Sequence, residues 1–86
     1  MNQNQQTTAQ QALFKPRRVA VKLHYTAINQ FCYMWVEHDR PFDFHVKESS
    51  RNRELLGICF DVANFETVDF LKELPDNIRG VEIIDI

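Results

Sequence analysis

Two histidines and one cysteine are the residues of this chain whose types and spacing could carry chemistry. His24, His45 and Cys59 each fall in a stretch that alternates apolar and polar residues, which is the period of a strand buried on one face. We expect all three on the polar face, together with Lys22 and Lys47. Gly57 is expected between the two histidines, in one row across three strands. Imidazole and thiolate groups are ligands that zinc accepts. A fourth ligand is not apparent, so we favour surface histidines and infer no metal and no cofactor.

Catalysis has little support in the sequence. A nucleophile needs a positioned base beside a serine, cysteine or threonine, but Ser49 and Ser50 lie in an expected loop and both cysteines lie in apolar periodic segments. The chain has two glycines, too few for a loop that cradles phosphate groups. We therefore predict that the protein is not an enzyme, and we infer no small-molecule ligand.

The composition narrows the remaining classes of function. A chain of 86 residues with 44% hydrophobic residues forms one domain with one core. Its ten basic and twelve acidic residues do not supply the strong positive field of a non-specific nucleic-acid binder. No apolar run approaches the roughly 20 residues of a membrane span. The absence of a secretory layout and the two cysteines favour a reducing, cytoplasmic location.

Alternation and turn residues predict four strands. The segment 19–25 places Val19, Val21, Leu23 and Tyr25 on one face. The segments 42–48 and 55–62 alternate in the same way, with Phe42, Phe44 and Val46 on the apolar face of the first, around a polar loop at 49–53, which is typical of a hairpin. A last segment, 81–86, is apolar on both faces, so its parity, that is, which of its residues face the core, is ambiguous.

Apolar residues at helical spacing predict two helices. The first runs from Thr26, as its N-cap, to Asp39, and its stripe contains Ile28, Phe31, Cys32, Trp35 and Val36. The same residues also suit a strand, but the helical spacing and the signals at both ends favour a helix. The second helix is capped by Asn64, is expected to end at Pro75, and has an apolar side formed by Phe65, Val68, Leu71 and Leu74.

The order strand, helix, strand, strand, helix, strand describes an α+β fold of the split βαβ, or ferredoxin-like, kind. Right-handed crossovers place both helices on one face of a four-stranded antiparallel sheet, in the spatial order fourth, first, third, second strand. The alternative is an antiparallel meander of four strands with one helix and a last strand. Residues 1–15 are read as a polar flexible leader and residues 16–86 as a single α+β domain.

A small binding or regulatory module that acts through protein–protein contacts is the favoured function. We expect a protein partner or a second copy, as a homodimer, to bind the open sheet face and the last strand, which lies at an edge of the sheet. The residues assigned to this contact are His24, His45, Leu55, Cys59, Val81 and Ile83. The alternative is nucleic-acid binding by basic residues at the start of the domain and in the hairpin loop: Lys15, Arg17, Arg18, Arg51 and Arg53.

Overall fold

The computed structural model of the protein describes residues 16–86, and the predicted leader, residues 1–15, lies outside them. The described chain forms strands and helices in the predicted order. The strands are β1 Arg17–His24, β2 Phe44–Glu48, β3 Leu55–Val62 and β4 Glu82–Asp85. The α-helices are α2 Ile28–Glu37 and α3 Phe65–Asn77, and a short 3-10 turn, η1 Tyr25–Ala27, precedes α2.

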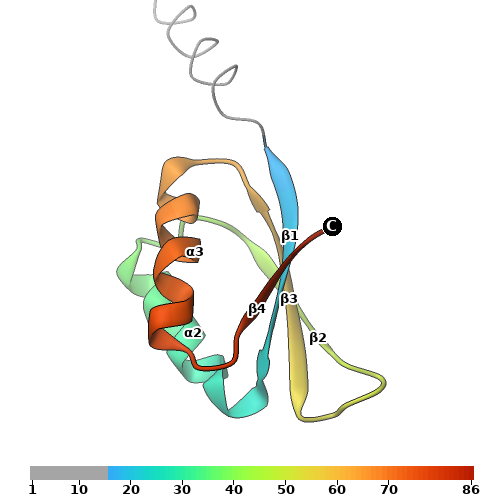
Figure 1. Ribbon diagram of the computed structural model, residues 1–86. Coiled ribbons are helices and arrows are strands. Elements are labelled where there is room, and N and C mark those ends of the chain that lie inside the picture. The colour runs from blue at the N-terminus through green and yellow to red at the C-terminus, as the bar shows by residue number, and fades with distance from the viewer. Residues whose placement is uncertain (1–15) are drawn as a thin grey trace, which may run out of the picture.

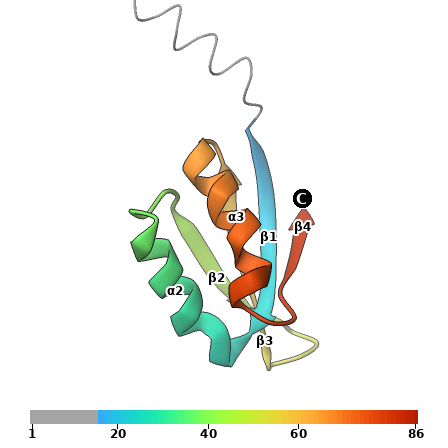
Figure 2. The same cartoon turned by 60° about the vertical axis from the view of Figure 1, so that its left-hand side comes forward.

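The four strands form one antiparallel sheet in the order β2-β3-β1-β4. Read from the opposite edge, this is the expected order of fourth, first, third and second strand. Both helices lie on the same side of the sheet, α2 toward β2 and α3 toward β1 and β4 (Figure 1 and Figure 2). The predicted α+β class is confirmed, and the alternative meander is wrong because its contested segment is the helix α2.

Aromatic rings fill the space between the sheet and the helices. Phe31 of α2 is fully buried, and its ring centroid lies 5.2 to 6.4 Å from those of four other phenylalanines. Aromatic pairs contribute about 0.5–1.5 kcal/mol beyond the apolar area that they bury. The inward residues of β1 and β3 form the floor of this core, as their alternation predicts: Val19, Val21, Leu23, Ile58, Phe60 and Val62.

The start of α2 differs from the prediction. Thr26 was expected to cap this helix, but it lies inside η1, and α2 begins at Ile28 without a side-chain cap. The His24 ring caps η1, the turn that precedes α2, because its Nδ1 accepts the Thr26 backbone N–H at 3.3 Å. His24 can do this because it is the last, extended residue of β1, and an extended residue before a helical turn is the geometry of a cap.

The start of α3 follows the prediction. The Asn64 side-chain oxygen accepts the Thr67 backbone N–H at 2.8 Å, which caps the helix. The Asn64 amide nitrogen also donates to the Pro41 carbonyl at 2.9 Å. One asparagine therefore both caps α3 and holds the chain that leads into β2.

The end of α3 corrects the prediction that Pro75 stops this helix. The helix continues through Pro75 to Asn77. A proline lacks only its own N–H, so it removes one bond to the carbonyl four residues earlier. The following bonds persist, since the Ile78 N–H donates to the Leu74 carbonyl at 2.9 Å.

Four residues assigned to apolar faces are exposed instead: Tyr25, Val36, Val46 and Phe65. Tyr25 lies beyond the last residue of β1, Val36 lies in the last turn of α2, and Phe65 is the first residue of α3. Met34 of α2 and Phe70 of α3 are buried in the core in place of Val36 and Phe65. An apolar stripe of this width permits more than one rotation of a helix about its axis, and contact with the sheet selects one.

Candidate functional site

The side of the sheet that faces away from the helices, the open face, carries the predicted mixture of charged and apolar residues. Val21 and Ile58 are buried toward the helices, so their neighbours along each strand point to the open face. The strand pairing confirms this face for the predicted residues of the first three strands: Lys22, His24, His45, Lys47, Leu55, Gly57 and Cys59.

The register corrects the predicted row of His24, Gly57 and His45. His24 pairs with Leu55, and His45 pairs with Cys59, so the two histidines lie in different rows. Each histidine is displaced by two residues from its expected partner Gly57, His24 toward the start of β3 and His45 toward its end. A displacement of two keeps every side chain on its face but changes its neighbours. The displacement of His45 arises at the hairpin, where the Ser49 N–H donates to the Leu55 carbonyl at 3.1 Å. The displacement of His24 arises in the separate pairing of β1 with β3.

The new register removes the geometric basis for a zinc site. Among residues 16–86, no group of three or more His, Cys, Asp or Glu side chains is placed to hold a metal ion. His24 instead contacts its own surroundings, with its Nδ1 2.7 Å from the Thr26 hydroxyl oxygen and its Nε2 3.8 Å from a Glu54 carboxylate oxygen. His45 has Cys59 as its partner across the strand pair.

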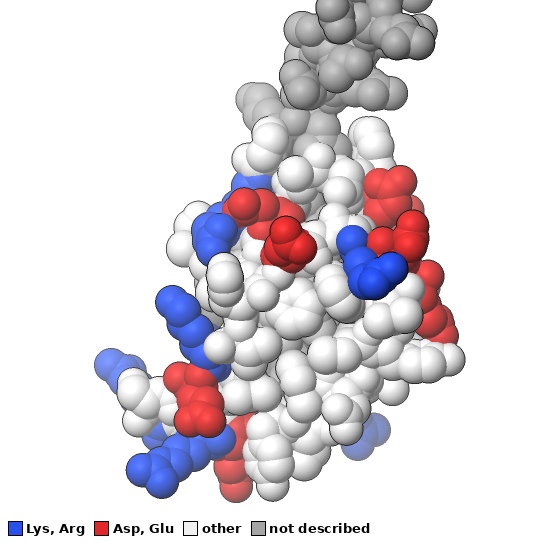
Figure 3. Space-filling model, turned by 180° about the vertical axis from the view of Figure 1, so that it is seen from behind, with Lys and Arg blue, Asp and Glu red and all other residues white. Residues whose placement is uncertain are grey.

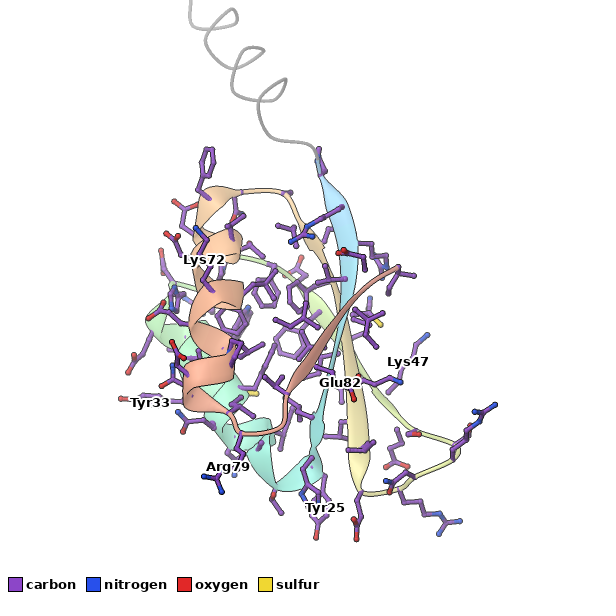
Figure 4. The ribbon with its side chains drawn as sticks, viewed as in Figure 1. Tyr25, Tyr33, Lys47, Lys72, Arg79 and Glu82 are labelled. Carbon is purple, nitrogen blue, oxygen red and sulfur yellow. The ribbon has the colours of Figure 1, made fainter. Side chains whose placement is uncertain are left out.

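A row of two lysines with a glycine between them occupies the place of the predicted histidine row. Gly57 pairs with Lys47 on one side and with Lys22 on the other, and Lys22 pairs in turn with Glu82 of β4. The open face therefore has two lysines on either side of a residue without a side chain. Figure 4 shows Lys47 directed away from the helices.

A hollow of about 360 Å³ is lined by the residues of this row and by part of the β2–β3 loop. Figure 1 shows this loop turning away from the helices. We call this hollow the Gly57 hollow. Its volume falls within the range of roughly 300–1,000 Å³ that is typical of small-molecule sites. It is lined by Lys22, Lys47, Glu48, Ser49, Ser50, Arg51, Leu55, Leu56 and Gly57.

The charges around the Gly57 hollow are mostly positive. Lys22, Lys47 and Arg51 contribute three cations, and Glu48 contributes one carboxylate. None of the ion pairs among the described residues includes any of these three cations. Sequence reasoning placed both lysines on the open face but did not connect them. The signal that could have connected them is a glycine in the middle of a strand, which often marks the close approach of another group.

The basic residues of the nucleic-acid alternative do not form one patch in the described part of the chain. Arg17 and Arg18 lie at one end of β1 and pair with Asp85 and Asp61, both at 2.9 Å. Arg51 and Arg53 lie in the hairpin loop, at the opposite end of the sheet. Lys15 is outside the described residues.

The parity of β4 corrects the assignment of Val81 and Ile83 to the open face. Ile83 pairs with Val21, whose side chain points to the helices, and Val81 packs against the core. Ile84, paired with Ala20, is the β4 isoleucine on the open face. The alternation could not reveal this, because residues 81, 83, 84 and 86 are all apolar and make both faces look alike.

The outer edge of β4 presents unpaired backbone groups. The Ile86 N–H donates to the Arg18 carbonyl of β1 at 3.0 Å. Backbone groups of successive strand residues point alternately to either side, so Ile84 and Glu82 also face β1, and Ile83 and Asp85 face outward. Ile83, Ile84 and Ile86 are 37%, 36% and 69% exposed. The edge therefore combines free donors and acceptors with apolar side chains.

The flank of the molecule opposite β4 exposes an area with few charged residues. Seen from behind, it shows a broad area without lysine, arginine, aspartate or glutamate (Figure 3). The elements at the back of Figure 1 are α2 and β2, on which Val36 and Val46 are exposed. This flank was not anticipated, since both valines were expected to be covered.

Comparison with known proteins gave no match: no family model fits the chain, and no curated protein or solved structure is significantly similar to it. Within residues 16–86, no helix has the length and apolar character needed to cross a membrane. The described site must therefore be interpreted from its own geometry.

Proposed function

We propose that the protein is a small, non-enzymatic binding module that acts through protein–protein contacts, and that its partner at β4 is a second copy of the chain. The observation that supports this most directly is the outer edge of β4. An edge strand with unpaired backbone groups and apolar side chains is a template for another strand. Among the described residues, β4 pairs with β1 alone.

The apolar residues of β4 provide the driving force. Ile83, Ile84 and Ile86 remain exposed on a domain that is small enough to have a limited core. Burying a whole isoleucine side chain stabilises by about 1.5–3 kcal/mol. Partial burial of these residues from each of two copies is therefore a substantial contribution for a small interface.

A two-fold axis through Ile84 gives a register that suits the charges. Ile84 then lies beside its own copy on the open face, Ile83 lies opposite Asp85 of the second copy, and Glu82 lies opposite Ile86 of the second copy. No carboxylate faces another one, which avoids the repulsion of like charges across a strand pair. The outward groups of Ile83 and Asp85 exchange hydrogen bonds in this register, so the two sheets join into one.

The test is sedimentation equilibrium of the full chain over a wide range of concentrations, with two matched variants. Ile83→Pro removes an outward N–H and leaves the β1–β4 ladder intact. Two hydrogen bonds are lost per dimer, at about 1 kcal/mol each, so the Kd should rise about thirtyfold. Val46→Pro is the control. Val46 is also β-branched, lies on the other edge strand, β2, and has a backbone N–H that points away from the neighbouring strand. It should leave the Kd within a factor of two.

Two results would contradict this proposal. One is a wild-type protein that stays monomeric at every concentration reached. The other is a dimer that survives Ile83→Pro but is lost in Val46→Pro, which would place the interface at β2. Cooperative thermal unfolding of both variants shows that each is folded, so that a loss of association reports on the edge.

We further propose that the arrangement belongs to the split βαβ, ferredoxin-like kind and that the protein is cytoplasmic. The first proposal is supported by the element order and by the strand order β2-β3-β1-β4 with every neighbour antiparallel. The second is supported by Cys32 and Cys59, which are both free, as is usual for thiols in a reducing compartment.

A further inference from the structure

We propose that the Gly57 hollow binds a small, multiply charged oxyanion: a phosphate group or a polycarboxylate carried by a small organic molecule. None of the residues that line this hollow belongs to β4, so this proposal does not rest on the proposed dimer. Three features of the hollow support the proposal: the glycine at its base, the cations at its sides and the hydroxyl groups of its loop.

The glycine leaves space that the backbone does not require. Gly80 has a φ of +76°, which explains a glycine there, but Gly57 lies in a strand without a positive φ. A Cβ at Gly57 would meet only the Lys47 carbonyl oxygen, at 3.9 Å, which is ordinary contact. Glycine in a strand costs about 0.5–1 kcal/mol relative to alanine. Neither local strain nor a neighbouring backbone accounts for this cost, whereas a group that enters the hollow does.

The cations define the charge of that group. Lys22 and Lys47 flank Gly57 in one row, and Arg51 lies at the rim in the loop. Glu48 also lines the hollow, and Glu82 pairs with Lys22 across the strands. Neither carboxylate is within ion-pair distance of the three cations, because all ion pairs of the described residues involve other groups. Cations held near each other without counter-ions attract an anion with more than one charge.

The loop supplies neutral donors. The Ser49 hydroxyl oxygen accepts the Asn52 backbone N–H at 3.2 Å, so its own hydrogen remains available to donate. The Ser50 hydroxyl also lines the hollow. Hydroxyl and ammonium donors together suit the several acceptor oxygens of phosphate or of a polycarboxylate. Leu55 and Leu56 form an apolar wall, and the remaining volume accommodates the organic part of the ligand.

The test is an NMR titration of the full chain with inorganic pyrophosphate and, separately, with citrate. Sodium chloride at matched ionic strength is the reference. We expect saturable shifts of the Gly57, Lys47 and Ser50 amides with at least one oxyanion and no saturation with chloride. Preference for pyrophosphate identifies a phosphate ligand, and preference for citrate identifies a carboxylate ligand.

Two variants and a matched control complete the test. Lys22→Met removes one flanking charge while keeping the length of the side chain, and should weaken binding about fivefold. Lys72→Met removes the same charge from α3, on the opposite side of the molecule (Figure 4), and should change binding less than twofold. Gly57→Val fills the hollow with a residue that strands favour, so binding should be lost in a folded protein.

Three results would overturn the proposal. The first is a set of shifts with either oxyanion that chloride reproduces. The second is an equal effect of Lys22→Met and Lys72→Met, which would indicate attraction by net charge alone. The third is unchanged binding in Gly57→Val, which would place any anion elsewhere on the surface.

Discussion

The two glycines of the chain should respond to alanine in opposite directions. At Gly57 the added Cβ has room and the strand backbone suits alanine, so Gly57→Ala should stabilise the fold by about 0.5–1 kcal/mol. At Gly80 there is also room, but the φ of +76° is left-handed. An alanine in that region costs about 1–2 kcal/mol of stability. The lower conformational entropy of the unfolded chain with alanine offsets part of this cost. Gly80→Ala should therefore destabilise by about 1 kcal/mol.

Urea denaturation at equilibrium measures both changes, with the wild type as reference and with unchanged slopes as the check that each variant unfolds in the same way. Thermal unfolding gives a second reading, since 1 kcal/mol moves the Tm of a domain of this size by about 4–8 °C. A Gly57→Ala protein that is less stable than the wild type would refute the reasoning, because it would mean that the backbone needs glycine there. A Gly80→Ala protein as stable as the wild type would refute the second half.

Two further predictions concern the buried and exposed residues of the two helices. Phe31→Leu should destabilise the fold by about 1–3 kcal/mol, since Phe31 is fully buried among other rings. Phe65→Leu should cost less than about 0.5 kcal/mol, because Phe65 is 61% exposed. Equal losses of stability in urea denaturation would contradict the packing. The pKa of Tyr33 is raised, first by its hydrogen bond to Glu37 and then by the charge of that carboxylate. Glu37→Gln should therefore lower the pH at which the Tyr33 ring titrates by NMR, and an unchanged titration would exclude this interaction.

The strands of the sheet were predictable because their signal has a period of two. Alternation placed Lys22, Lys47 and Gly57 on the correct face. It could not decide which of them are neighbours, since a slip of two residues leaves every face unchanged. The hairpin loop sets the pairing of Lys47 with Gly57, and no local preference in Ser49–Arg53 fixes where that ladder begins. The separate ladder between β1 and β3 sets the pairing of Lys22 with Gly57. The row of Lys22, Gly57 and Lys47 was therefore not predicted, although each of these residues was placed on the correct face of the sheet.

The parity of β4 and the rotation of the helices were not predictable for a related reason. Ile83 and Ile84 are equally apolar, so only pairing with β1 distinguishes the helix side from the open side. Val36 and Met34 compete in the same way for the core side of α2, and contact with the sheet decides in favour of Met34. Such choices depend on tertiary contacts, which a periodic pattern does not contain.

The position of Lys22 between Gly57 and Glu82 connects the two proposed sites. If both proposals hold, an oxyanion in the hollow places negative charge in the same row as the Glu82 carboxylate, and a second strand beside β4 removes water from that carboxylate. Occupation of one site would then alter the free energy of occupying the other. By thermodynamic linkage, the factor by which the anion changes the dimer constant equals the factor by which dimerisation changes the affinity for the anion.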